Sequence, residues 1–398
     1  MKKLFRPLAA LLAVAISTLA CSSSFNVVEP KSPSPTEVTR QTEAPITDTV
    51  DLLSRPLYFL GKDSQSLNQV YRIERDGKTQ IQLTFESVPV TDYDVSRVDG
   101  SIAYVASNQL LLANADGSNR RVLIDGGSSA DLRGSYNPVY SPDGKTLAYA
   151  RDGLNLYDFS TGLTNLVLAD QPLGGSLPPE IYVPDKFSPN GTKLLLKVAH
   201  PPDSPWTAAI YSISTKTLIQ IVGENESLSC CTMYGGAEWS ADGSNIYAVA
   251  TTPDSSTPFG VLWKVDAATG AVTTLMAGAA GEGDARLFYL PYKPYPALDG
   301  QLYFFSAKFA ESAGYFRRVP LILVRSKPDD ITTNWSVLRA DTFELMNEAL
   351  WAPDAGFVIV ALAPTEDVYD GGQAEIVYLD GRSNVVLTPF AQEMKWGP

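Results

Sequence analysis

A short phrase that recurs along the chain limits the possible folds more than any other feature of the sequence. Its plainest copy spans residues 137–168, where an apolar segment reaches Ser-Pro-Asp-Gly and the segments LAYA, LNLYDF and TNLVL follow. Pro presets the second turn position, Asp bonds the nearby backbone, and Gly accepts the positive φ that the next strand requires. One copy therefore predicts four short strands joined by tight turns, which is one blade of a β-propeller.

The phrase returns closely at residues 185–198 and 237–250, and more loosely at 94–106, 295–307 and 349–361. Its turn markers are 44 to 57 residues apart, a spacing expected for blades with loop insertions. The markers are Gly100, Gly144, Gly191, Gly243, Gly300 and Ala355. Ala355 in place of glycine predicts a distorted turn. An aromatic residue precedes four of the markers and is expected to wedge between neighbouring blades: Tyr140, Phe187, Trp239 and Trp351.

The two ends of the chain complete the repeat. Residues 56–85 contain three strand-like segments without an opening strand, and residues 393–398 (EMKWGP) look like an opening strand that stops at its turn. Joined, they make one blade, which would close the ring and cover its exposed edges. The sequence thus predicts an all-β protein, a β-propeller of seven four-stranded blades closed by pairing the C-terminal strand with the first blade. Six blades would result if residues 295–340 are an insertion.

The turn phrase followed by LAYA and LNLYDF resembles the repeat of the TolB-like β-propeller family, over about residues 55–398. The resemblance implies a periplasmic or extracellular propeller that is used for binding. TolB itself carries an additional N-terminal domain, for which residues 22–50 are too short.

Residues 1–20 are typical of an export signal, because basic residues precede an apolar stretch too short to cross a bilayer as a permanent helix. The sequence Thr18-Leu19-Ala20-Cys21 resembles the bacterial lipobox, in which the thiol of the first mature residue takes a diacylglycerol. The alternative is ordinary cleavage nearby, which leaves Cys21 free or removes it. Residues 21–50 are rich in Ser, Thr and Pro and predict a flexible tether ahead of a propeller over residues 51–398. We expect a lipid-anchored envelope protein, on the periplasmic or extracellular side.

Composition and motifs argue against several chemistries. The formal net charge of −13 disfavours nucleic acid as a partner. One histidine, His200, cannot build a multi-histidine metal site, and we expect it to be exposed in a loop. There is no room for a hydrolase domain with a Gly-x-Ser-x-Gly elbow, and the Asp-Gly turns lack the terminal Glu of a calcium loop. We expect no catalytic residues, no metal and no cofactor.

Cys230 and Cys231 are adjacent in the sequence. Thiols tend to be oxidised after export, and adjacent cysteines can form a strained vicinal disulfide. We expect this disulfide to stiffen its loop; two buried thiols, or bonds to a partner, are the alternatives.

In a propeller, the connections between second and third strands, and between blades, lie on one face, and here they are long. Long loops on a rigid scaffold commonly carry recognition, and aromatic residues with arginine commonly anchor interfaces. The candidate binding residues are Trp206, Phe259, Tyr289, Tyr292, Tyr315, Phe316, Arg317, Arg318 and Tyr369. We expect them to recognise an envelope protein. The alternatives are a glycan or small ligand at the channel mouth, or a hydrolase or lyase.

Overall fold

The computed structural model describes residues 51–126, 136–171, 174–175, 178–201, 206–222, 233–252, 259–276, 279–280, 287–310, 319–331 and 335–398. The chain divides into Met1–Asp48 and Thr49–Pro398. The predicted signal, the lipobox with Cys21 and the tether up to residue 50 lie outside the described residues. In the described part of the chain, no helix has the length and apolar character needed to cross a bilayer.

Thr49–Pro398 is built from antiparallel sheets. Four of the sheets in the described part have four strands each. Their strands are β4 (Asp92–Val95), β5 (Ile102–Ala106), β6 (Gln109–Ala113) and β7 (Arg121–Asp125); β8 (Val139–Tyr140), β9 (Thr146–Ala150), β10 (Gly153–Asp158) and β11 (Leu163–Ala169); β12 (Ile181–Phe187), β13 (Lys193–Ala199), β14 (Thr207–Ser212) and β15 (Thr217–Ile221); and β16 (Met233–Trp239), β17 (Asn245–Thr252), β18 (Phe259–Asp266) and β19 (Val272–Met276).

Two larger sheets follow along the chain. The five-stranded sheet contains β20 (Ala279–Ala280), β21 (Leu287–Pro296), β22 (Leu302–Ala310), β23 (Leu321–Ser326) and β24 (Ser336–Phe343), with a 3₁₀ turn, η3 (Pro328–Asp330), between β23 and β24. The seven-stranded sheet has, in spatial order, β25 (Met346–Trp351), β26 (Phe357–Leu362), β27 (Gly372–Tyr378), β28 (Val385–Trp396), β1 (Leu57–Lys62), β2 (Asn68–Ile73) and β3 (Gln80–Gln82).

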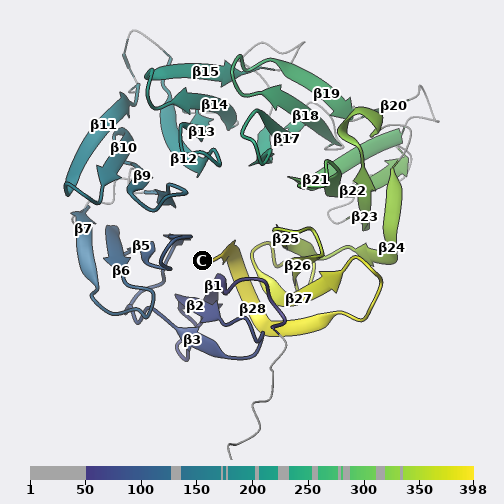
Figure 1. The fold of residues 1–398 in the computed structure, drawn as a ribbon, viewed down its shortest axis with the longest axis horizontal. Helices are drawn as coiled ribbons and strands as arrows, with labels where there is room; N and C mark the ends of the chain where they lie inside the picture. The colour runs from purple at the N-terminus through teal and green to yellow at the C-terminus, as the bar shows by residue number, and fades with distance from the viewer. Residues whose placement is uncertain are drawn as a thin grey trace, which may run out of the picture. The chain divides into compact units, whose positions relative to one another are not determined.

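The sheets follow one another around a common centre in the order of the chain (Figure 1). Strand β28 pairs with two different strands. Its first part, from Val385 to Ala391, pairs with β27, and its last part pairs with β1, where Leu57 lies opposite Trp396. The pairing that the sequence predicts between the two ends of residues 56–398 is therefore present.

The repeated turns have the expected backbone. Gly144 has φ +70°, and its N–H donates to the carbonyl oxygen of Ser141 at 2.9 Å. Ala355 takes the same left-handed conformation with φ +54°, although it carries a side chain. The predicted distortion at Ala355 is thus a strained residue in a turn of normal hydrogen bonding, since its N–H donates to Ala352 at 2.9 Å.

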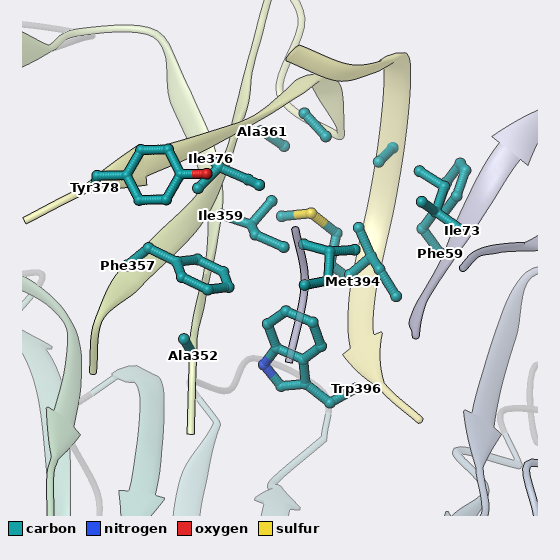
Figure 2. Packing of buried hydrophobic residues seen from close by; sticks show 14 residues of the cluster. Phe59, Ile73, Ala352, Phe357, Ile359, Ala361, Ile376, Tyr378, Met394 and Trp396 are labelled. Carbon is teal, nitrogen blue, oxygen red and sulfur yellow. The ribbon is translucent and has the colours of Figure 1, made fainter. Parts of the chain in front are cut away.

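The hydrophobic core lies between neighbouring sheets, where the inner-strand aromatics pack. Tyr140, Phe187, Trp239 and Trp351 are all buried, and each belongs to a cluster that combines two consecutive sheets. The prediction that they wedge between blades is confirmed. Trp396 takes the same place at the end of β28, and Figure 2 shows its indole beside Phe357 and Met394.

Candidate functional site

A cavity of about 850 Å³ lies at the centre of the sheets, and its volume is within the range of small-molecule sites. Its walls come from the innermost strands, β4, β8, β12, β16, β21, β25 and β28. The side chains of these strands that face the centre therefore decide what the cavity can bind.

Several innermost strands carry one more residue than the strand beside them. The register shifts between Pro184 and Lys186 in β12, and between Tyr292 and Tyr295 in β21. Strand β28 shifts in the same way where it pairs with β1. Such bulges re-aim side chains and occur frequently next to functional sites.

Two of the bulged positions hold charged residues in the left-handed region. Lys293 in β21 has φ +48° and Glu393 in β28 has φ +52°, and both line the cavity. A non-glycine residue held in this way costs about 1–3 kcal/mol. The fold thus places a cation and a carboxyl group on the cavity wall at strained positions.

One wall of the cavity is rich in carboxyl groups. Strands β4, β25 and β28 contribute Asp92, Asp94, Glu348, Glu393 and Lys395. Lys395 pairs with Asp94 at 3.3 Å and also donates to the carbonyl oxygen of Tyr93. The carboxylate of Glu348 accepts the backbone N–H groups of Glu393 at 2.8 Å and Met394 at 3.2 Å, which holds the bulge in β28.

Asp92 and Glu393 form a carboxyl pair on this wall. Burial raises the pKa of Glu393 to about 8, and the charge of Asp92, the charge of Glu348 and a hydrogen bond to Asp92 add to the shift, while Lys395 opposes it. Burial also raises the pKa of Asp92, again against the field of Lys395. Two carboxyl groups this close do not both ionise readily, so the pair holds a proton near neutral pH.

The other strands around the cavity carry most of its lysines. Lys186 pairs with Glu238 at 2.7 Å, and Lys197 pairs with Asp185 at 3.1 Å. Lys293 differs, because no carboxylate of the described residues lies within ion-pair distance of it; its Nζ lies 5.6 Å from the ring centre of Tyr292. Burial lowers the pKa of Lys293, although the charge of Glu348 opposes this.

The indole N–H groups of three inner-strand tryptophans differ in whether they have a hydrogen-bond acceptor. Trp351 Nε1 donates to the carbonyl oxygen of Lys293 at 2.9 Å, and Trp396 Nε1 donates to that of Trp351 at 2.7 Å. Trp239 also lines the cavity and is 5% exposed, but its buried Nε1 has no acceptor in the described structure.

Of the candidates predicted from the loops, none of those in the described residues lines this cavity. Trp206 and Tyr369 lie on the β13–β14 and β26–β27 connections with 41% and 49% of their surface exposed. Tyr315, Phe316, Arg317 and Arg318, together with Cys21, Cys230 and Cys231, lie outside the described residues.

Three predicted loop residues belong to strands instead. Phe259 is the first residue of β18, and Tyr289 and Tyr292 are inside β21. Pro291 and Pro294 lie within β21, and β20 pairs only with the first two residues of that strand. The rest of that edge needs no N–H donors, so prolines are tolerated there. The Tyr292 hydroxyl donates to Asn347 at 2.7 Å and joins two sheets.

His200 lies in the β13–β14 connection, as expected, but it is only partly exposed. Its side chain is 23% exposed, and its Nε2 lies 2.8 Å from the hydroxyl of Thr207. His200 is thus part of the packing at the end of β13. In the described residues, no three His, Cys, Asp or Glu side chains are grouped in a way that could hold a metal ion.

The sequence contained a signal for the cavity that our loop-based reasoning did not use. Charged residues interrupt the opening segment of almost every repeat, as in PDKF, AEWS, YKPY and EMKW. On an innermost strand, a charged side chain next to an aromatic residue that packs between two sheets points toward the centre of the propeller.

No protein-family model matches this chain, and no curated protein matches it. Several solved structures are similar to this chain. TolB from Acinetobacter baumannii is 14% identical over 87% of this chain and 67% of that chain, with a TM-score of 0.48. An oligogalacturonate lyase from Vibrio parahaemolyticus is 12% identical over 84% and 85%, with a TM-score of 0.53.

A prolyl endopeptidase structure is 11% identical over 86% of this chain and 49% of that chain, with a TM-score of 0.54. At these identities the likeness concerns the fold alone. Together with the radial sheets, it identifies a β-propeller fold.

Proposed function

We propose that this chain is an exported, lipid-anchored binding protein, a closed propeller of seven blades that holds a small polar ligand in its central cavity. The blade count is supported by the seven-stranded sheet. It contains β25–β28 and then β1–β3 joined to the end of β28, which is the arrangement that two blades sharing one strand would give.

The strained, charged bulges carry the binding proposal. Folding alone gains nothing from a lysine and a glutamate at positive φ on a cavity wall, since glycine would relieve the strain at both. Charged and hydrogen-bonding groups that converge on a cavity of this size are the usual composition of a ligand site. The envelope location and the lipid on Cys21 are supported by the export signal and lipobox in the sequence.

The test is a ligand screen by thermal shift on the full chain and on a variant with a filled cavity. Ala349 lines the cavity, whereas Ala268 is exposed in the β18–β19 turn, so Ala349→Phe and Ala268→Phe form a matched pair. A cavity ligand at a hundredfold excess over its Kd should stabilise wild type and Ala268→Phe by about 2.7 kcal/mol. It should have little effect on Ala349→Phe. Ligands that stabilise all three proteins equally would contradict a central site.

A protein partner on the long-loop face is the second candidate. The observation that favours it is the exposure of Trp206 and Tyr369 on loops of that face. In a pull-down from envelope extracts, Trp206→Ala and Tyr369→Ala should each weaken capture of such a partner by about 1–4 kcal/mol. Lys145→Ala and Asn245→Ala, beside turns of the opposite face, are the controls. Capture that depends only on the control positions would exclude this face.

A further inference from the structure

The bulge in β21 that carries Lys293 is fixed by hydrogen bonds from the neighbouring sheet. The Tyr292 hydroxyl donates to the carbonyl oxygen of Asn347 at 2.7 Å, and Trp351 Nε1 donates to the carbonyl oxygen of Lys293 at 2.9 Å. These bonds hold Lys293 in its left-handed conformation, with φ +48°. Residues that bind or react in a site are commonly held by such supporting contacts. Lys293 therefore has a fixed position on the cavity wall.

The surroundings of Lys293 place its amine inside the cavity. Burial is the main cause that lowers the pKa of this amine, yet the residue keeps an intermediate exposure. A group that is surrounded by protein and still reached by water faces an enclosed space. The charges that act on the pKa of the amine all belong to residues that line the cavity: Glu348, Lys186, Asp185 and Lys197.

Lys293 differs from the other lysines of the cavity. Three of the four lysines that line it form an ion pair with a carboxylate, Lys186 at 2.7 Å, Lys197 at 3.1 Å and Lys395 at 3.3 Å. Burial acts against the charge on Lys186 and Lys395, but the neighbouring carboxylates raise the pKa of both. Lys293 has no such partner among the described residues, and the charges of Lys186 and Lys197 add to burial in lowering its pKa, against the charge of Glu348. Lys293 therefore holds more uncharged amine than Lys186 or Lys395 at a given pH.

The cavity also contains a proton donor. The Asp92–Glu393 pair holds a proton near neutral pH, and both of its residues line the cavity. The charge of Glu348 acts on Glu393 and on Lys293, so the acid and the amine have a common neighbour. An uncharged lysine amine is a nucleophile toward carbonyl groups, and desolvation or a nearby cation is the usual means of keeping it uncharged. A nucleophilic amine and a proton donor are the two groups that imine formation needs.

We propose that Lys293 forms a reversible imine with a small polar ligand of the hydroxyaldehyde class. The nitrogen adds to the carbonyl carbon, and one of its protons passes to the carbonyl oxygen. The new hydroxyl group takes a proton from the Asp92–Glu393 pair and leaves as water, which gives a protonated imine; hydrolysis reverses the step, and nothing is oxidised or reduced. The ligand's hydroxyl groups suit a cavity lined by charged side chains. This assignment rests on the proposed function and adds the class of the ligand and the bond that holds it.

The experiment is a short incubation of the full chain with pyridoxal and sodium cyanoborohydride at neutral pH, followed by digestion and mass spectrometry of the lysines. Pyridoxal carries an aldehyde and a hydroxyl group, and its imines do not rearrange to stable products. Label that needs the reductant therefore reports an imine. Label on Lys293 should build up roughly tenfold faster than label on Lys186 and Lys395, which line the same cavity.

The variants separate the amine from the cavity around it. Lys293→Arg keeps a positive charge but cannot form an imine, so the single fast label per chain that intact mass should show in wild type should be absent. Ala349→Phe should slow the labelling of Lys293 about tenfold or more by filling the cavity, whereas Ala268→Phe should leave it unchanged. Lys145 is exposed outside the cavity and should be labelled at one rate in all of these proteins. Wild-type labelling alone decides the matter if Lys293→Arg fails to fold.

Two results would overturn the assignment. One is that Lys293 is labelled no faster than Lys186 and Lys395, and the other is that the label on Lys293 forms equally well without the reductant. If the thermal-shift screen still finds ligands whose effect Ala349→Phe abolishes, the cavity is a binding site that holds its ligand without a covalent bond. If Ala349→Phe changes neither the screen nor the labelling of Lys293, the central site itself is wrong.

Discussion

Ala355 replaces the glycine of the repeated turn, but its backbone keeps the conformation of those glycines. Its φ of +54° is the conformation that Gly144, Gly191 and Gly243 take in the equivalent turns. A side chain in this region costs about 1–2 kcal/mol. Ala355 is nevertheless only 6% exposed and belongs to the same core cluster as Trp351, so burial offsets part of the strain.

Ala355→Gly should change the free energy of unfolding by less than about 1 kcal/mol, in the stabilising direction. Relief of the left-handed strain should stabilise the fold by about 1–2 kcal/mol. The conformational entropy that glycine loses on folding and the loss of the methyl contact should offset most of this gain. Urea denaturation measures the change. The reverse substitution, Gly144→Ala, has no compensating pocket and should destabilise by more than Ala355→Gly stabilises.

Glu393 makes the stability of the fold depend on pH. Its pKa in the folded protein is about 8 against an ordinary value of 4.5, so between these two pH values the folded state holds more protons than the unfolded chain. Stability therefore falls as the pH rises through this window. Glu393→Gln keeps the shape and can donate to Asp92. It should be more stable than wild type by about 1–2 kcal/mol at pH 8 and have a flatter pH profile.

Thermal melting between pH 5 and pH 9 measures this effect. Glu366→Gln, at an exposed carboxylate in the β26–β27 connection, is the control and should follow the wild-type profile. If Glu393→Gln also follows it, the Asp92–Glu393 pair is ionised throughout and our account of the acid-rich wall is incorrect.

At the level of secondary-structure elements, the sequence predicts those features that depend on neighbouring residues in the chain. The Ser-Pro-Asp-Gly turns and the aromatics before them were found because each depends on a few adjacent residues. The cavity depends on register, since a shift of one residue turns side chains to the other face of a strand. The bulges that aim Lys293 and Glu393 at the centre have no turn signal of their own. Tyr289 and Tyr292 were expected in a loop but lie in β21, which pairs with β22 although it contains Pro291 and Pro294.

Strand β28 joins the two ends of the sheet system, and its last residues also carry core packing. Trp396 is 6% exposed, its ring centre lies 6.1 Å from that of Phe357, and its Nε1 donates to Trp351. The N–H of Gly397 donates to Pro56 at 2.9 Å. The segment thus stabilises both of its neighbours.

Trp396→Ala should cost about 3–5 kcal/mol, as truncation of a buried aromatic generally does. Deletion of residues 393–398 should cost more, because it also uncovers β1 along its length. Removal of Pro398 alone leaves β28 intact and should have little effect. Differential scanning calorimetry on the three proteins tests this order, and an unchanged melting temperature after the six-residue deletion would exclude an essential β28–β1 pairing.

At the scale of the whole molecule, charge and attachment have to be considered together. The formal net charge of −13 disfavours contact with an anionic bilayer surface, since such surfaces attract basic segments and repel acidic ones. A protein of this charge would stay near a membrane only if something else provided the binding energy. The lipobox resemblance at Cys21 predicts two acyl chains from the diacylglycerol, and two chains give stable anchoring where one is marginal.

Cys21→Ser should therefore move the protein from the membrane fraction to the soluble fraction of the envelope. Cys231→Ser is the matched control, because it replaces a cysteine elsewhere in the same chain and leaves Cys21 in place. Fractionation in the presence and absence of detergent, followed by immunoblotting, measures the distribution. Each buried methylene of an acyl chain contributes about 0.8 kcal/mol, so loss of both chains should release nearly all of the protein. A processed Cys21→Ser protein that still needs detergent for extraction would show that an attachment other than the lipid holds it.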